Sequence, residues 1–168
     1  MIQYHRMKTK RVQLNTLLIL ALCLVYFCSY LTRLNFSATM VEIIASGVLT
    51  KTQAGMVGTA LFITYGVGQL VSGFLGDKLR PNYIILFGLF LTSGCNLLLP
   101  FMQGYFGFIV VWAVNGLAQA MMWPPIVKIL SEFCDKQTYG KACVWITAAS
   151  QLATVAIYLL VPLCIRFL

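Results

Sequence analysis

The residues best suited to chemistry in this sequence surround one basic side chain inside an apolar stretch, "SYLTRLNFSATMV", from Ser29 to Val41. Arg33 follows Tyr26 and Tyr30 at the spacing i, i+4, i+7. At about 100° per residue, these three side chains share one face of a helix. Two phenolic hydroxyls and a guanidinium can hydrogen-bond an oxyanion, and arginine can hold a phosphate or carboxylate with two parallel bonds. We therefore predict an anion-binding site on this face.

The position of Arg33 is energetically costly, because an arginine at the centre of a membrane helix costs about 2.5–3.5 kcal/mol. The apolar run continues beyond it to Ile44, which is about 16 Å of helix. Extension of the side chain to the lipid headgroups is one interpretation, but that distance is long for it. We favour a water-filled cavity within a helix bundle, since charges inside membrane spans commonly mark functional sites.

The composition places the chain in a membrane. Of its 168 residues, 60% are hydrophobic and 10% are charged, whereas a soluble domain is about a quarter charged. We predict an all-α membrane protein, in which a spanning helix needs about 20 apolar residues. After a basic tail at residues 1–13, the predicted spans are residues 14–44, 54–75, 83–102, 106–130 and 142–165.

The lysines and arginines predict the orientation. If the spans alternate, nine basic residues fall on the side of the N-terminus, and only Lys51 and Arg166 fall on the other. Because cytoplasmic loops carry the excess of basic residues, the N-terminus is expected to be cytoplasmic. We expect an integral, multi-pass protein of the plasma or inner membrane. The basic residues lie in connections between spans, so the net charge of +8 does not indicate a nucleic-acid partner.

Other classes of site have little support in the sequence. It offers no Ser/His pair, no paired carboxylates and no metal-ligand cluster, so we expect neither an enzyme nor a metal or cofactor. Glu42 is near the outer end of the first span, which gives no support to proton coupling. The cysteines show no CxxC spacing, and we interpret them as small buried side chains; they are Cys23, Cys28, Cys95, Cys134, Cys143 and Cys164.

The second span leads into a polar turn with a family signature. Gly68, Ser72 and Gly76 repeat every four residues, which allows helices to approach closely in lipid. The following stretch "GFLGDKLRP" resembles the G-x-x-x-D-[RK]-x-G-[RK] turn of the major facilitator superfamily, although Leu79-Arg80-Pro81 departs from its end. The resemblance implies a cytoplasmic latch between two transporter halves, with Asp77 as its carboxylate; its residues are Gly73, Asp77, Lys78 and Arg80.

Two further stretches, "CSYLTRLNF" and "GLAQAMMWPPIVK", are similar to segments of the organophosphate:phosphate antiporters. The resemblance implies that Arg33 binds a phosphoryl group together with a partner arginine of the seventh helix. It also implies an aromatic lining for the pocket, formed here by Tyr26, Tyr30, Tyr65, Trp123 and Trp145. Independently, Pro124 and Pro125 interrupt the hydrogen bonding of the fourth span and predict a bend there.

The pocket implied by this resemblance is less basic than that of the family. Leu34 and Gln69 stand where the family has lysines, and Ala149 falls near the position of a histidine in the glycerol phosphate transporter. Glycerol phosphate is therefore a doubtful substrate. A phosphorylated or other anionic metabolite is the leading prediction.

The expected function is that of a secondary active transporter for organic phosphates or related anions, which exchanges them for inorganic phosphate by alternating access. One alternative is a facilitator for a carboxylate or sugar acid. Another is a small, non-transporting membrane protein that pairs with partner helices. A facilitator has twelve helices in two halves of inverted three-helix repeats, and the five spans match an incomplete N-terminal half. We expect a fragment, from a truncated frame, a split gene or part of a longer protein, whose partner would be the C-terminal half.

Overall fold

A computed structural model describes the backbone of residues 2–167 and the side chains of residues 14–76 and 78–167. Its elements are α1 (Ile2–Ala38), α2 (Met40–Ala45), α3 (Lys51–Lys78), α4 (Pro81–Leu98), η1 (Leu99–Phe101), α5 (Gly104–Ala120), α6 (Trp123–Phe133) and α7 (Lys136–Phe167).

The all-α fold class and its five apolar spans are confirmed. Within the described residues, five stretches are long and apolar enough to cross a membrane: Leu14–Ala45, Lys51–Gly76, Pro81–Phe101, Gly104–Phe133 and Lys136–Phe167. Most helices extend a few residues beyond the predicted ends.

Local chemistry explains where α3 and α4 begin. The Thr50 hydroxyl accepts a hydrogen bond from the Gln53 amide at 3.3 Å, and Gln53 Oε1 accepts one from the Thr50 amide at 2.9 Å. This reciprocal capping starts α3 at Lys51, several residues before the predicted span. Pro81 occupies the first position of α4, where a missing N–H costs no helical hydrogen bond.

The fourth span consists of two helices, α5 and α6. Helix α5 ends at Ala120, a turn at residues 121–122 follows, and α6 begins at Trp123. Pro124 and Pro125 therefore lie in the first turn of α6, where proline is tolerated. The bend expected from the proline pair takes the form of a complete break between two helices.

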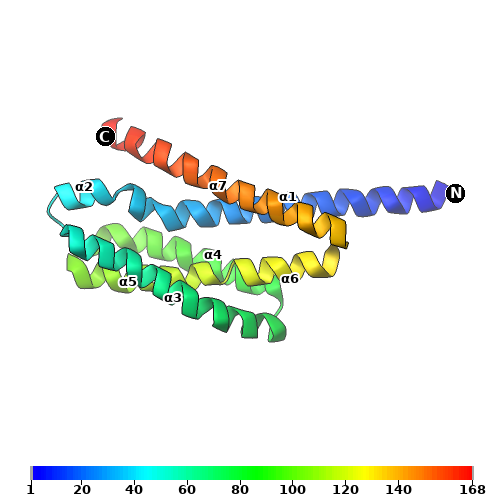
Figure 1. The fold of residues 1–168 in the computed structure, drawn as a ribbon, viewed down its shortest axis with the longest axis horizontal. Coiled ribbons are helices and arrows are strands. Elements are labelled where there is room, and N and C mark those ends of the chain that lie inside the picture. Colours follow the sequence, from blue (N-terminus) through cyan, green and yellow to red (C-terminus); the bar gives the residue numbers. More distant parts are fainter. Residues whose placement is uncertain (1, 168) are drawn as a thin grey trace.

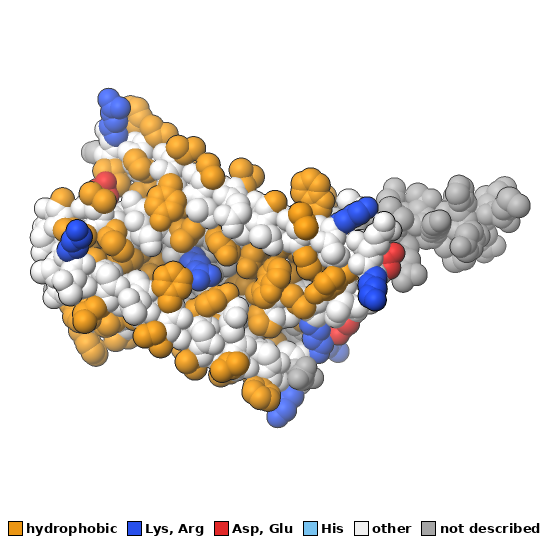
Figure 2. Space-filling view, in the orientation of Figure 1, with side chains coloured by type: hydrophobic (Ala, Val, Ile, Leu, Met, Phe, Trp, Pro, Cys, Tyr) orange, Lys and Arg blue, Asp and Glu red, His pale blue; other side chains and the backbone are white. Residues whose placement is uncertain are grey.

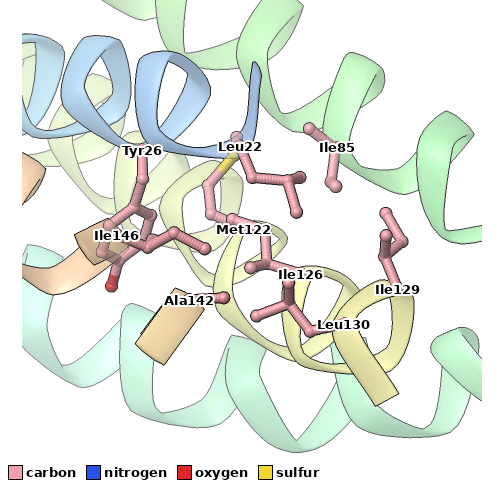
Figure 3. Packing of buried hydrophobic residues seen from close by; sticks show 9 residues of the cluster. All are labelled: Leu22, Tyr26, Ile85, Met122, Ile126, Ile129, Leu130, Ala142 and Ile146. Atoms are coloured by element: carbon pink, nitrogen blue, oxygen red, sulfur yellow. The ribbon is translucent and has the colours of Figure 1, made fainter. Parts of the chain in front are cut away.

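The helices pack in two main pairs, as Figure 1 shows. Helix α1 runs along α7, and α3 runs along α5, with α4 beside α5. Two buried hydrophobic clusters join these pairs. The first contains residues of α1, α4, α6 and α7; Figure 3 labels Leu22, Tyr26, Ile85, Met122, Ile126, Ile129, Leu130, Ala142 and Ile146. The second joins α1, α3 and α5 around Phe36, Val57 and Trp112.

A glycine on α5 allows the close approach of α3 and α5. A Cβ atom on Gly116 would overlap the Leu61 carbonyl and the Thr64 hydroxyl of α3. Of the predicted repeat, Gly68 makes a similar contact, since its Cβ would lie 2.8 Å from that of Ala120. A Cβ atom on Gly76 would meet nothing within 4 Å, so the structure does not require a small residue at this position of the repeat.

The outer faces of the helices carry many large apolar side chains, among them Phe74, Phe90 and Phe106, each more than 75% exposed. Figure 2 shows hydrophobic side chains over the middle of the molecule and basic side chains mostly near its two ends. One further basic group lies midway between these ends. This distribution fits a lipid environment.

The cysteines are only partly as expected. All six are free thiols, but only Cys95 is buried, whereas Cys28 and Cys164 are exposed. The interpretation as buried side chains is therefore wrong for Cys28 and Cys164. In a membrane protein an apolar position can face lipid, so an apolar run does not predict burial within the chain.

We predict that Gly116→Ala destabilises the bundle by about 1–3 kcal/mol, the usual cost of overpacking. The added methyl group would meet the Leu61 carbonyl, which is backbone and cannot rotate away. Thermal unfolding in detergent micelles measures the effect. Gly94→Ala is the matched control, because its Cβ would meet nothing within 4 Å. Equal stability of the two variants would contradict the proposed close contact.

Candidate anion-binding site

The guanidinium of Arg33 extends from α1 to the aromatic side chains of α3. Its Cζ lies 4.3 Å from the ring centroid of Tyr65, 5.5 Å from that of Phe62 and 5.7 Å from that of Tyr30. A cation at such a distance gains about 0.5–2 kcal/mol from the ring. The side chain is half-buried. These contacts offset part of the cost of a charge at this depth.

The contacts of Arg33 leave its charge and its N–H donors available to bind an anion. The five N–H donors of a guanidinium lie in its plane, whereas aromatic rings interact with its flat face. Within the described part of the chain, no acidic side chain forms an ion pair with Arg33. An anion that approaches in the plane of the group can therefore receive two parallel hydrogen bonds.

A line of aromatic rings extends from Arg33 towards α6. The ring centroids of Tyr30 and Tyr26 are 5.1 Å apart, and those of Tyr26 and Trp123 are 5.4 Å apart. Tyr26 is buried, whereas Tyr30 and Trp123 are half-buried. The structure thus brings five of the predicted binding residues into one series of contacts, which we call the Arg33 cluster: Tyr26, Tyr30, Arg33, Tyr65 and Trp123.

The sequence analysis did not predict two contacts beside the cluster, one of Gln69, which it named only as a position where the family has a lysine, and one of Phe62. Gln69 donates a hydrogen bond from Nε2 to the Tyr65 hydroxyl at 2.7 Å, one turn along α3. This bond holds the ring that Arg33 contacts. Phe62, three residues before Tyr65, presents a second ring to Arg33. The i, i+3 and i, i+4 spacings around Tyr65 could have indicated both contacts.

Trp145 does not join the Arg33 cluster. It is 66% exposed and lines a groove between α1 and α7 with Cys23 and Lys141. The buried face of α7 is formed by Ala142, Ile146, Ser150 and Ala153. Trp145 directly precedes Ile146, so its side chain leaves the helix about 100° away from that face. Its grouping with the other pocket aromatics is therefore not seen in this chain.

Comparison with known proteins identifies the family of this chain. Residues 22–168 match the family model described as Major Facilitator Superfamily. The chain belongs to the Major Facilitator Superfamily.

Several relatives within this superfamily have names that refer to phosphorylated compounds. The chain is 33% identical over 115 residues to the "Probable hexose phosphate transport protein" of Chlamydia trachomatis, which covers 68% of this chain and 25% of that protein. It is 29% identical over 128 residues to the "Glycerol-3-phosphate transporter" of Haemophilus influenzae, which covers 73% of this chain and 27% of that protein.

A third relative is named as a sensor. The chain is 33% identical over 123 residues to the "Membrane sensor protein UhpC" of Salmonella typhimurium, across 73% of this chain and 28% of the relative. The matched region thus spans between 25% and 28% of the length of these three relatives. No solved structure matches the chain.

The turn between α3 and α4, which the sequence analysis compared with the superfamily signature, is exposed where its basic residues lie. Lys78 ends α3, Arg80 precedes α4, and both side chains are exposed. A Cβ atom on Gly73 would meet nothing within 4 Å. The Asp77 side chain, the predicted latch carboxylate, lies outside the described residues.

A lysine that the signature does not include connects this turn to α6. Lys128 is half-buried, and its Nζ donates a hydrogen bond to the Gly76 carbonyl at 2.5 Å. That carbonyl is one of the last four of α3, which lack partners within the helix. A cation there also interacts favourably with the negative end of the helix dipole. Lys128 therefore caps α3 from a neighbouring helix.

We predict that Lys128→Met lowers the stability of the bundle by about 1.5–3 kcal/mol, the usual contribution of a hydrogen bond from a charged group. The variant keeps the aliphatic length but removes the bond to Gly76. Unfolding in detergent micelles at constant ionic strength measures the loss. Lys141→Met is the control, since Lys141 is exposed on α7. If both variants are equally stable, Lys128 does not act as a cap.

Proposed function

We propose that this chain provides an anion-binding half-site of a secondary active transporter for organic phosphates or related anionic metabolites. The observation that carries the proposal is the Arg33 guanidinium, which extends between α1 and α3 onto aromatic rings without an acidic partner among the described side chains. The relatives named for hexose phosphate and glycerol-3-phosphate transport support a phosphorylated substrate.

The charge of Arg33 favours exchange over one-way movement. All four acidic residues lie in terminal turns or connections: Glu42, Asp77, Glu132 and Asp135. None of these positions is at the depth of Arg33, so a bound anion would provide its countercharge. A cation without a counterion is costly in a region of low dielectric constant. The empty site would therefore change conformation slowly, and inorganic phosphate would be the anion that returns it.

Alternating access requires a second half against which this half moves. The proposal therefore includes as a partner the C-terminal half of a transporter, with a further basic group opposite Arg33, in a lipid bilayer. The N-terminus would be cytoplasmic in the plasma or inner membrane. The exposed Lys78 and Arg80, together with Asp77 and Gly73, would form the latch at that surface.

Two alternatives remain for the same site. A carboxylate or sugar acid would bind Arg33 with the same pair of bonds, and inorganic phosphate would then compete weakly. A non-transporting protein that pairs with partner helices is favoured by one observation, the relative named as a membrane sensor. Such a protein would bind the anion but would not exchange it.

We predict that Arg33→Lys weakens phosphate binding by at least about tenfold, which corresponds to about 1.4 kcal/mol. Lysine keeps the charge but lacks the planar fork that gives two parallel bonds. Binding of radiolabelled phosphate to the whole chain in lipid nanodiscs measures the change. Arg80→Lys, at the exposed turn, is the matched control and should bind like the wild type. Unchanged binding by Arg33→Lys would contradict the role of Arg33.

Transport is tested separately from binding. We predict that proteoliposomes loaded with inorganic phosphate take up glucose 6-phosphate when they contain the chain together with the second half of its transporter. Binding without exchange under these conditions would favour the non-transporting alternative. Uptake that phosphate does not inhibit, but that a sugar acid does, would favour the carboxylate alternative.

A further inference from the structure

A buried network of polar side chains lies on the side of α1 next to the Arg33 cluster. We propose that Gln119 of α5 is a positioning residue, which fixes the rotation of α1 about its own axis so that Arg33 faces Tyr65. The consequence for anion binding rests on the function proposed above. The geometric part, which places the guanidinium, does not depend on it.

Gln119 is the centre of this network. Its side chain is 3% exposed, and Oε1 accepts a hydrogen bond from the Ser29 hydroxyl at 2.6 Å. Its Nε2 has two N–H donors and three acceptors within reach: the Ser29 carbonyl at 3.1 Å, the Thr32 hydroxyl at 3.2 Å and the Thr92 hydroxyl at 2.9 Å. A single amide from α5 thus contacts both α1 and α4.

The network extends to the residue immediately before Arg33. The Thr92 hydroxyl donates to Asn115 Oδ1 at 2.5 Å, and both side chains are fully buried. The Thr32 carbonyl accepts hydrogen bonds from Asn115 Nδ2 at 3.3 Å and from Asn96 Nδ2 at 2.9 Å. Both the hydroxyl and the carbonyl of Thr32 are therefore held by side chains of α4 and α5.

Helix geometry converts this restraint into a direction for Arg33. Consecutive side chains leave a helix about 100° apart, so fixing Thr32 towards α4 and α5 directs Arg33 to the neighbouring side, where α3 lies. A rotation of α1 would separate Ser29 and Thr32 from their partners. Because Ser29, Thr92, Asn115 and Gln119 are buried within apolar spans, water could not replace the bonds among them. The network therefore resists rotation.

Apolar packing also restrains α1, whose side chains Leu22, Tyr26 and Phe36 are buried in the two hydrophobic clusters. The first cluster also includes Ile146 of α7, whose buried face otherwise carries the small residues Ala142, Ser150 and Ala153. Apolar contacts tolerate small rotations, whereas hydrogen bonds are directional. The network therefore adds rotational specificity at the turn of α1 that carries Arg33.

The proposal is tested by nuclear magnetic resonance of the whole chain, labelled with ¹⁵N-arginine in detergent micelles. The Arg33 Nε–H signal is assigned by its loss in Arg33→Lys, and the Tyr65 ring should shift it upfield from the other arginine signals. In Gln119→Leu, which conserves size without polar atoms, we expect this signal to move towards the others. Ser150→Ala is the control, because this buried hydroxyl bonds within its own helix, to the Thr147 carbonyl.

A signal at the same position in the wild type and in folded Gln119→Leu would overturn the proposal. If Gln119→Leu does not fold, Thr92→Val provides the second variant, because it keeps the shape and Gln119 while removing the hydroxyl bonded to both Gln119 and Asn115. It should move the signal in the same direction by a smaller amount, and an unchanged position would also overturn the proposal.

Titration of the same samples with inorganic phosphate separates the two proposals. We expect at least about a tenfold loss of affinity in Gln119→Leu, which corresponds to about 1.4 kcal/mol. If the wild-type signal does not respond to phosphate, the anion site is wrong, whereas a displaced signal in Gln119→Leu still supports the positioning role. If the displaced signal is accompanied by unchanged phosphate affinity, the functional part of this inference is wrong.

Discussion

The contact between the Arg33 guanidinium and the Tyr65 ring, at 4.3 Å, is the interaction on which this account depends. A cation in the middle of an apolar helix is tolerated only when its surroundings offset the loss of water. Here the Tyr65 and Phe62 rings contact the group, and Gln69 holds Tyr65 by a hydrogen bond. Contacts with rings do not use up the N–H donors as an ion pair would, so these can bind an anion. The same features that make the charge tolerable therefore also make it useful.

The fold produces this contact through two different kinds of interaction, close packing and hydrogen bonding. Close approach of α3 and α5 depends on small residues, above all Gly116, which meets α3 at Leu61 and Thr64, next to Tyr65. The direction of Arg33 depends instead on polar contacts from α1 to Gln119 and Thr92. Packing sets the distance between helices, and hydrogen bonds set their rotation. Both are needed to bring a side chain of α1 onto a ring of α3.

Much of this arrangement could be predicted from the sequence, because periodicity is a local property. Hydropathy indicated the five spans, and the i, i+4, i+7 spacing indicated that Tyr26, Tyr30 and Arg33 share a face. The partner of that face could not be predicted from spacing, since it depends on how helices pack. For this reason the contact of Phe62 with Arg33 and the cap by Lys128 were missed, and Trp145 was grouped with aromatics that it does not contact. The bond from Gln69 to Tyr65 lies within α3, so its i, i+4 spacing could have indicated it. The two exposed cysteines show the same limit, because lipid replaces protein as the neighbour of an apolar position.

The central claim is that Arg33 itself binds the anion. Its most direct test is a ³¹P–¹⁵N distance measurement by solid-state nuclear magnetic resonance, on the whole chain in lipid bilayers loaded with inorganic phosphate. The account predicts that the guanidinium nitrogens of Arg33 lie in hydrogen-bond contact with the phosphate. Phosphate in contact only with arginines at the ends of helices, such as Arg80, would contradict it.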